Sequence, residues 1–575
     1  MDWRPVLVLS VLAVALRAYA EEAALTLVAE GQPKAVVVVA AAPSTAATEG
    51  AKILVEHLVQ MSGARLETLK DGQLGEVTVK EGRIASPVTK LADMAFVLVG
   101  ESALTEKLGV TAKGLGPGGI LVRTMPNALV LLGPDAQTPS DPNGTRYAIT
   151  TFLHDQLDCR YLWPGELGKV VPQRRTISVP KLDVQLTPLL RQRNIRSLHY
   201  HDRLQQGLDR LKFTKDDFLR VRAAAEATQA ASNTWFGWHR MGGTLNLVPG
   251  HAFGHVWAKY SQDHPEWFAM QPNGSRDQTK LSPTRSRLCK SNRELIAAIA
   301  QEKIEQLNKG TGPMSVSVGP NDGGHATFCV CHDCKKLDPP EARKITLWDL
   351  TSVPRRDFEY VSLTDRTVFF WNGIAERVTK AHPNALLVAD AYSAYSAPPV
   401  RAKLHPNLVI RFAPISYSSD KARQQGRADW DAWSAAAPKI YFRPNLLLLG
   451  RREGTLAIYV HKLAEDFRYL AHHSMMGTDF DSCCHNWATQ GLNYYVLARL
   501  HWNPDQKADD LIDDYCRSGF GRAAAEVKRY LTRVEQLTDE MAAKELEVTQ
   551  PYTPAVVGEL RGILDAADKA AGDEI

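Results

Sequence analysis

Short apolar runs alternate with amphipathic segments along most of the chain, which is the pattern of strands and helices that follow one another. In the first third, residues 24–29 and 35–42 predict two strands. Residues 47–61 place apolar side chains at helical spacing, and Gly63 is a typical residue for ending such a helix. This mixture predicts a small α+β domain over residues 21–179.

From residue 188 the alternation becomes more regular, with longer helices between the strands. A helix is predicted at 215–230, and strands are predicted at 194–196, 315–318, 385–391, 407–412, 439–442 and 475–477. This order is typical of a TIM-type (β/α)8 barrel, which we place at residues 188–502. The fold class is therefore α/β: a barrel preceded by a small α+β domain and followed by helices at 503–575. Because the chain stops inside an alanine-rich helical stretch, we expect this C-terminal region to be truncated.

Composition narrows the classes of function. Hydrophobic residues make up 44% and charged residues 23% of the 575 positions, which is ordinary for a globular protein. The 68 basic and 64 acidic residues nearly cancel, with no basic run, so we expect no nucleic-acid partner. Eight cysteines in a chain of this length do not form a disulfide scaffold.

The N-terminus carries a targeting signal. Residues 6–16 are apolar and follow Arg4, and Ala18-Tyr19-Ala20 has the small residues of a cleavage site. This pattern predicts a signal peptide at residues 1–20, since the apolar run is too short for a typical membrane span. We expect a secreted or periplasmic protein with no membrane insertion after cleavage.

The stretch 315–334 holds the densest group of reactive side chains. Its strand breaks at Gly319-Pro320, and Asn321 and Asp322 follow in the loop. In an α/β barrel the loops after the strands build the active site, so this position favours Asp322 as a catalytic residue and Asn321 as a binding residue. The alternative is an Asx-turn, in which Asp322 caps its own loop.

Other candidates also follow predicted strands. Glycoside hydrolysis needs paired carboxylates, and aromatic rings stack on sugar faces. Asp479 and Asp481 are the further catalytic candidates, and Arg443 could meet a uronate or a sulfate. The predicted sugar-binding aromatic and imidazole residues are Trp235, Trp238, His239, His325, Tyr392, Tyr395 and Trp487. The alternative is that the aromatic side chains only plug the mouth of the barrel.

Asp479 and Asp481 are two positions apart. In an extended strand both side chains point to one side, with Phe480 on the other. Two close carboxylates repel, so one of them could keep a proton and serve as an acid. They could equally bind a cation or lie in a solvated loop.

Cys329, Cys331, His332 and Cys334 form a dense group of metal-ligand types. Three thiolates and an imidazole could hold zinc, but four ligands at such tight spacing are hard to arrange. A Cys331–Cys334 disulfide or free thiols are favoured instead, and Asp333 disfavours a catalytic thiolate. We therefore expect no metal and no cofactor, and Cys289 looks isolated.

Several of these segments resemble a family of secreted bacterial proteins known as a domain of unknown function. They are HPEWFAM at 264–270, LCKSN at 288–292, the 319–334 loop, GLNYYVLARLHW at 491–502 and YAITTFLHDQLDCRYLWPGELGKVVP at 147–172. The resemblance implies an N-terminal domain like that of α-glucuronidases and β-hexosaminidases, followed by a TIM-type glycosidase barrel.

The resemblance also implies a relation to endo-β-N-acetylglucosaminidases that cut N-glycans. Related hexosaminidases use the acetamido oxygen of the substrate as nucleophile, with an Asp-Glu pair at a strand end. Here that position reads Asn321-Asp322, without a glutamate. The first interpretation is a secreted glycoside hydrolase acting on N-acetylhexosamine- or uronic-acid-containing glycans. The alternatives are a non-catalytic glycan-binding protein and a metal-dependent enzyme built on the cysteines.

Overall fold

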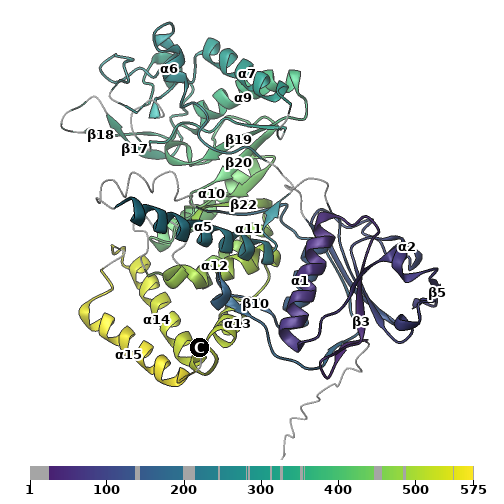
Figure 1. Ribbon diagram of the computed structural model, residues 1–575. Helices are drawn as coiled ribbons and strands as arrows, with labels where there is room; N and C mark the ends of the chain where they lie inside the picture. The colour runs from purple at the N-terminus through teal and green to yellow at the C-terminus, as the bar shows by residue number, and fades with distance from the viewer. Residues whose placement is uncertain are drawn as a thin grey trace, which may run out of the picture.

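The structure is a computed structural model that describes residues 25–135, 143–197, 214–243, 247–445, 456–483 and 487–573, apart from short gaps within 280–355 and at 548–549. Figure 1 shows the N-terminal sheet in purple beside the central sheet, with the C-terminal helices in yellow. The predicted signal peptide lies outside the described residues.

The N-terminal part is built on a six-stranded sheet with the order β13-β8-β9-β7-β3-β4. Its strands are β3 (Ala35–Val39), β4 (Thr68–Lys70), β7 (Ala95–Val99), β8 (Ile120–Met125), β9 (Ala128–Leu132) and β13 (Asp183–Leu186). Helices α1 (Thr45–Ser62) and α3 (Gly144–Asp155) pack together over one face of this sheet, and α2 (Ala103–Lys107) packs on the other. Gly63 ends α1 with a φ of 77°, as its position in the sequence predicts.

Three small sheets accompany it. β1 (Leu25–Ala29) lies between β2 (Gln32–Pro33) and β12 (Ile177–Val179), and the two remaining pairs are β5 (Thr78–Lys80) with β6 (Arg83–Ala85) and β10 (Arg160–Tyr161) with β11 (Lys169–Val170). The strands predicted at 24–29 and 35–42 are thus confirmed as β1 and β3, in two different sheets.

The central sheet has seven strands in the order β15-β14-β22-β21-β20-β19-β16. They are β14 (Gln192–Ser197), β15 (Gly242–Gly243), β16 (Ser315–Ser317), β19 (Leu386–Ala391), β20 (Leu408–Phe412), β21 (Ile440–Phe442) and β22 (Met475–Cys483). All neighbours from β14 to β16 pair in parallel, and only β15 is antiparallel. The helices between the strands are α5 (Lys215–Trp238), α6 (Val256–Tyr260), α7 (Arg293–Asn308), α8 (His332–Lys336), α9 (Thr364–Ala381), α10 (Asp420–Ala436) and α11 (Val460–Ala471).

The expectation of a closed eight-stranded barrel is met in part. The sheet curls into a half-barrel, and in the described part of the chain its hydrogen-bonded order ends at β16 and β15. Beside β16, His251 forms a parallel β-bridge with Gly319. The short segment around His251 therefore extends this edge of the sheet. β17 (Lys344–Asp349) and β18 (Arg356–Val361) pair with each other as a separate hairpin.

Four helices complete the chain: α12 (Trp487–Trp502), α13 (Ala508–Phe520), α14 (Ala524–Ala543) and α15 (Pro554–Ala571). α12 is buried along almost its whole length and packs on α11 and α13. Arg160 of the N-terminal part binds Asp514 of α13 through two hydrogen bonds of 3.0 Å. Among the described helices, none is both long and apolar enough to cross a membrane.

Candidate functional site

A cavity opens at the carboxyl ends of the parallel strands, with about 590 Å³ of empty space that includes open solvent. The residues that line it are His251, Asp322, Asp390, Tyr392, Arg411, Arg443, Asn445 and Asp481. They come from the ends of four neighbouring strands, from the loop after β16 and, for His251, from the segment before α6. This is the edge at which parallel α/β sheets bind their ligands. Four predicted site residues, Asp322, Tyr392, Arg443 and Asp481, therefore lie together.

Arg411 of β20 is the buried centre of the cavity floor. Its guanidinium donates two hydrogen bonds to the Asp390 carboxylate, one of them 2.9 Å long, and a third of 3.1 Å to Asp479 Oδ2. Burial opposes the charge of Arg411, but the Asp390 carboxylate raises its pKa above the usual value. Such a buried guanidinium holds the strands β19, β20 and β22 in one arrangement.

Two more arginines extend these contacts. Arg196 lies 3.1 Å from Asp479 and 2.6 Å from Asp481, and Arg443 donates a hydrogen bond of 2.9 Å to Asp481. Carboxylates and guanidinium groups thus alternate across the sheet. We call this set the Asp–Arg network: Asp390, Arg411, Asp479, Arg196, Asp481 and Arg443.

Asp479 and Asp481 point to the same side of β22, and Phe480 is buried on the other side, as the spacing predicts. Asp479 does not line the cavity, because its side chain is 2% exposed and also accepts a hydrogen bond of 2.8 Å from Asn194. Since arginines flank both carboxylates, the repulsion behind the proposed acid role is cancelled. Asp479 is better described as a positioning residue beneath the cavity.

Asp322 differs from the other carboxylates of the cavity. Its side chain is 44% exposed, and Arg285, at 3.7 Å, is its nearest described ion-pair partner. The Arg287 guanidinium donates hydrogen bonds of 2.8 and 3.0 Å to the backbone carbonyls of Asp322 and Asn321. The loop is therefore held by its backbone, which leaves the Asp322 carboxylate at the cavity surface. Gly324, whose amide would close an Asx-turn with Asp322, lies outside the described residues.

The side-chain amide of Asn321, a predicted binding residue, is held by the protein's own backbone at the edge of a second cavity. Its side-chain oxygen accepts a hydrogen bond from Phe253 N, and its amide nitrogen donates to the carbonyls of Phe253 and Ser286. The amide is buried and occupied because it joins the loop after β16 to two neighbouring segments.

Close packing also explains Gly319, where a Cβ would lie 2.8 Å from an Asp390 oxygen.

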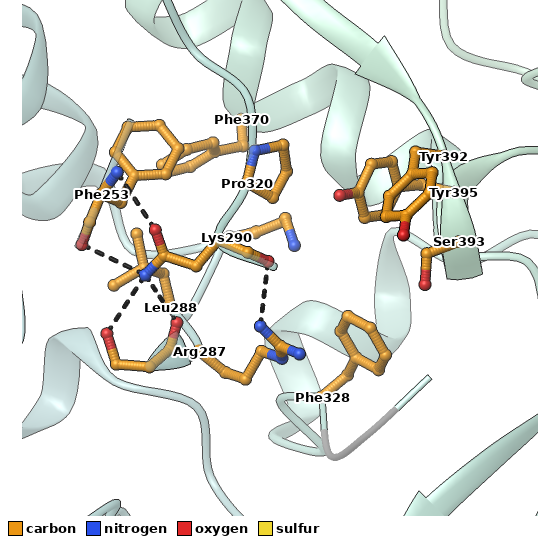
Figure 2. Close-up of a pocket in the computed structure, with 12 residues that line it drawn as sticks. Phe253, Arg287, Leu288, Lys290, Pro320, Phe328, Phe370, Tyr392, Ser393 and Tyr395 are labelled. Atoms are coloured by element: carbon orange, nitrogen blue, oxygen red, sulfur yellow. Dashed lines mark hydrogen bonds between the residues drawn. The ribbon is translucent and has the colours of Figure 1, made fainter. Parts of the chain in front are cut away.

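A second, narrower cavity of about 440 Å³ lies behind the loop. Figure 2 shows Tyr392 and Tyr395 across this cavity from Pro320, with Lys290 between them. Tyr392 lines both cavities, whereas Tyr395 is buried in the narrower one, and burial raises its pKa. Burial, together with the charges of nearby arginines, lowers the pKa of Lys290 to about 8.

Trp235, Trp238 and His239 do not reach either cavity. Helix α5 runs eight residues further than the predicted 215–230 and includes this aromatic segment. The Trp235 indole donates a hydrogen bond of 2.9 Å to the Tyr161 carbonyl, and Trp238 stacks on His57. All three side chains are buried against the N-terminal part. Their spacing of i, i+3 and i+4 is that of one buried helical face, which the placement of these residues after a predicted strand overlooked.

Trp487 and His325 are also away from the open cavity. Trp487 lies in contact with Trp235, with ring centroids 4.9 Å apart, and forms part of the same aromatic packing. His325 accepts a backbone hydrogen bond from Trp348 N and lies beside the β17–β18 hairpin. Neither residue lines a described cavity. His485, a further imidazole near the end of β22, lies outside the described residues.

The cysteines gather differently from the prediction. Cys289, Cys329, Cys331 and Cys334 form one group, with all four sulfur atoms within 4.8 Å of one another. The His332 side chain is 81% exposed and turned towards Asp333, so it is not a member. We call the four residues the four-cysteine group. None of the four forms a disulfide, so of the two alternatives that the sequence favoured, a Cys331–Cys334 disulfide and free thiols, the structure agrees with the second.

Sequence reasoning missed His251, Arg196 and Arg411. Arg411 had a usable signal, because a charged residue inside an apolar strand needs a buried partner. His251 follows a short apolar run and a Pro-Gly turn, and its Nδ1 lies 2.6 Å from the Pro320 carbonyl. That contact brings the imidazole to the wall of the cavity beside Asp322.

Comparisons with known proteins agree with this architecture. Residues 163–532 match the model of a family described as a domain of unknown function, DUF4838. No match is found among curated proteins. A structure titled as a novel family GH115 4-O-methyl-alpha-glucuronidase, BtGH115A, with specificity for decorated arabinogalactans, aligns with a TM-score of 0.50 and 11% identity over 95% of this chain and 69% of that one.

Two further glycoside hydrolases align less closely. A mutant Streptomyces plicatus beta-hexosaminidase in complex with GlcNAc gives a TM-score of 0.42 and 10% identity over 86% of this chain and 91% of that one. A family 89 glycoside hydrolase from Clostridium perfringens gives 0.37 and 12% over 86% and 53%. At these identities the similarity concerns the fold, which is that of a glycosidase-like α/β protein.

Proposed function

The chain belongs to the DUF4838 family, and we propose that it is a glycoside hydrolase acting on glycans that contain uronic acid or N-acetylhexosamine. The observation that carries the proposal is Asp322. It is an accessible carboxylate whose nearest described cation is the exposed Arg285 at 3.7 Å, on the wall of a cavity whose other carboxylates are bound closely by arginines. The glycosidase-like fold supports the choice of reaction.

In this proposal Asp322 is the general acid that protonates the leaving glycosidic oxygen. Asp481, held by Arg196 and Arg443 in the Asp–Arg network, stabilises the positive charge that develops on the sugar ring. Tyr392 forms the sugar platform, because it is the aromatic residue that lines the open cavity. The curled sheet is then the catalytic barrel of the molecule.

The cavity chemistry favours an anionic sugar over an acetamido sugar. Arg443 lines the cavity, and its buried Nε–H has no hydrogen-bond partner among the described residues. A guanidinium donor that is buried and unpaired suits a uronate carboxylate or a sulfate. Asn321, the predicted binding residue, offers no free amide group for an acetamido sugar, since backbone groups occupy its side-chain oxygen and nitrogen. Glucuronides are therefore the first substrates to test.

The test is a hydrolysis screen of chromogenic glucuronides, N-acetylhexosaminides and intact N-glycans with the wild-type chain and two variants. Asp322→Asn should lose at least about 100-fold in kcat, the usual contribution of a general acid. Asp71→Asn, which removes an exposed carboxylate of the N-terminal part, is the matched control and should keep the wild-type rate. A wild-type rate for Asp322→Asn would overturn the assignment.

A non-catalytic glycan-binding protein is the second candidate. It is favoured by the close pairing of Asp390, Asp479 and Asp481 with arginines, because each of these possible partners of Asp322 is already bound to a guanidinium. Saturable binding of a glucuronide or an N-glycan without turnover would identify this function.

Export is part of the proposal. The predicted signal peptide at residues 1–20 should be removed, which gives a mature chain that starts at Glu21. N-terminal sequencing of the protein from a culture supernatant or periplasmic extract would check this. Recovery of the full-length chain from the cytoplasm would contradict it.

A further inference from the structure

The four-cysteine group lies beside the narrower cavity, and no step of the proposed hydrolysis uses it. Cys289 precedes α7, Cys329 and Cys331 follow the loop after β16, and Cys334 lies in α8. Two segments that are separate in sequence therefore meet at four sulfur atoms. We propose that the four-cysteine group is a structural zinc site with four thiolate ligands.

The spacing of the sulfur atoms carries the proposal. Cys289 Sγ lies 3.8 Å from Cys331 Sγ and 3.8 Å from Cys334 Sγ. A tetrahedral zinc ion with Zn–S bonds of about 2.3 Å has ligand sulfurs about 3.8 Å apart. A disulfide would require about 2.05 Å. These two pairs of sulfurs are at the separation of ligands around one ion and too far apart to be bonded, and all four sulfurs lie within 4.8 Å of one another.

The surroundings also suit thiolates. Hydrogen-bond donors point at the sulfurs: Met270 N lies 3.3 Å from Cys329 Sγ, Cys334 N lies 3.4 Å from Cys331 Sγ, and the Ser291 hydroxyl lies 3.2 Å from Cys334 Sγ. Such outer donors orient and stabilise metal-bound thiolates. Three members of the group are buried. Polar donors stabilise a thiolate more than a neutral thiol, so these donors suit sulfurs that are bound to a metal as thiolates.

Charge balance points the same way. One Zn²⁺ and four thiolates carry a net charge of −2, and binding releases four protons to solvent. The side chain of Arg276, which interacts with the Cys289 thiol, supplies one compensating cation.

The location explains what the metal would do. Cys289 lies two residues after Arg287, whose guanidinium holds the backbone of Asn321 and Asp322. Cys329 and Cys331 end the same loop that begins with Asn321. A metal bound to all four cysteines would fix the segments that hold both ends of the loop carrying Asp322. The metal site is inferred independently of the hydrolase proposal.

The first experiment measures zinc in the complete chain purified without chelator or added metal. We expect about one zinc per chain. After replacement by Co²⁺, the absorption spectrum should show intense thiolate-to-cobalt charge-transfer bands with the intensity of four thiolates. A folded chain free of metal, or an intact mass lowered by the hydrogens lost to disulfides among these cysteines, would overturn the proposal.

Variants locate the site. Cys331→Ser, at the least buried member, should lower zinc retention during dialysis against a chelator at least tenfold. Cys516→Ser, which changes a buried free cysteine outside the group, should retain the metal like the wild type. If Cys331→Ser does not fold, the cobalt spectrum of the wild type decides the question alone. Equal zinc retention in both variants would refute the assignment of these ligands.

Discussion

Removal of Arg411 should destabilise the protein far more than removal of an arginine with the same contacts at the surface. Arg411→Met keeps much of the apolar stem and deletes the guanidinium. Asp390, which is 8% exposed at its side chain, then loses both of its described hydrogen bonds. Asp479 loses one bond but keeps Asn194 and Arg196.

The expected loss of unfolding free energy in Arg411→Met follows from the Asp390 carboxylate that is left without a partner. One buried carboxylate without a partner costs about 3–5 kcal/mol, because its hydration is lost and not replaced. Arg401 provides the matched control, since it also binds a carboxylate, that of Glu341, through two hydrogen bonds of 2.6 and 2.7 Å. These two side chains are 63% and 46% exposed, so Arg401→Met should cost less than about 1 kcal/mol.

The assay is urea unfolding followed by tryptophan fluorescence for the wild type and for both single variants. The double variant Arg411→Met with Asp390→Asn should recover part of the loss, because the unpaired charge is then absent. Equal, small shifts of the unfolding midpoint for the two arginine variants would refute the reasoning. So would a double variant that is as unstable as Arg411→Met.

Two further predictions concern residues outside the cavity. A hydrogen bond with Glu535 raises the pKa of His461 to about 9. The contribution of this contact to the free energy of unfolding is therefore complete below the unfolded pKa of 6.5 and is lost as the pH rises through about 9. Urea midpoints measured across this range should fall with pH in the wild type and change less in His461→Gln. Trp235→Ala should cost about 3–5 kcal/mol of unfolding free energy but leave glycan binding by the folded protein unchanged, because the indole is buried away from both cavities. Calorimetric titration with a bound glycan checks the second prediction, and weaker binding at unchanged stability would contradict it.

The sequence predicts strands well because the central sheet is parallel and covered by helices. Buried runs such as 385–391 and 407–412 are nearly continuous in apolar residues, and the structure has β19 and β20 there. Asp322, Tyr392, Arg443 and Asp481 could be chosen because they follow such strands. The pattern of apolar residues locates the end of each strand, and the carboxyl ends of parallel strands lie at the same edge of the sheet.

The errors arise where a residue type has two uses. Aromatic side chains serve both sugar binding and core packing, and the helical spacing of Trp235 and Trp238 favours packing. Cys289 could not be joined to Cys329 from the sequence, since 39 residues separate them and only the tertiary fold brings them together. Asn321 is placed correctly in the loop, but the sequence does not show that its amide is occupied by backbone groups.

Two parts of the site are held in place by different contacts: the floor of the cavity, which is the Asp–Arg network, and its wall, which is the loop that carries Asp322. In the Asp–Arg network every carboxylate contacts a guanidinium, so its charges nearly cancel and the side chains hold adjacent strands together. Asp322 belongs to the wall, which is fixed through Arg287, Asn321 and the segment that ends at the four-cysteine group. Loss of the cysteines should therefore move Asp322 while the network keeps its geometry. Substrate binding through Arg443 would then persist while turnover falls, so that kcat decreases more than KM changes.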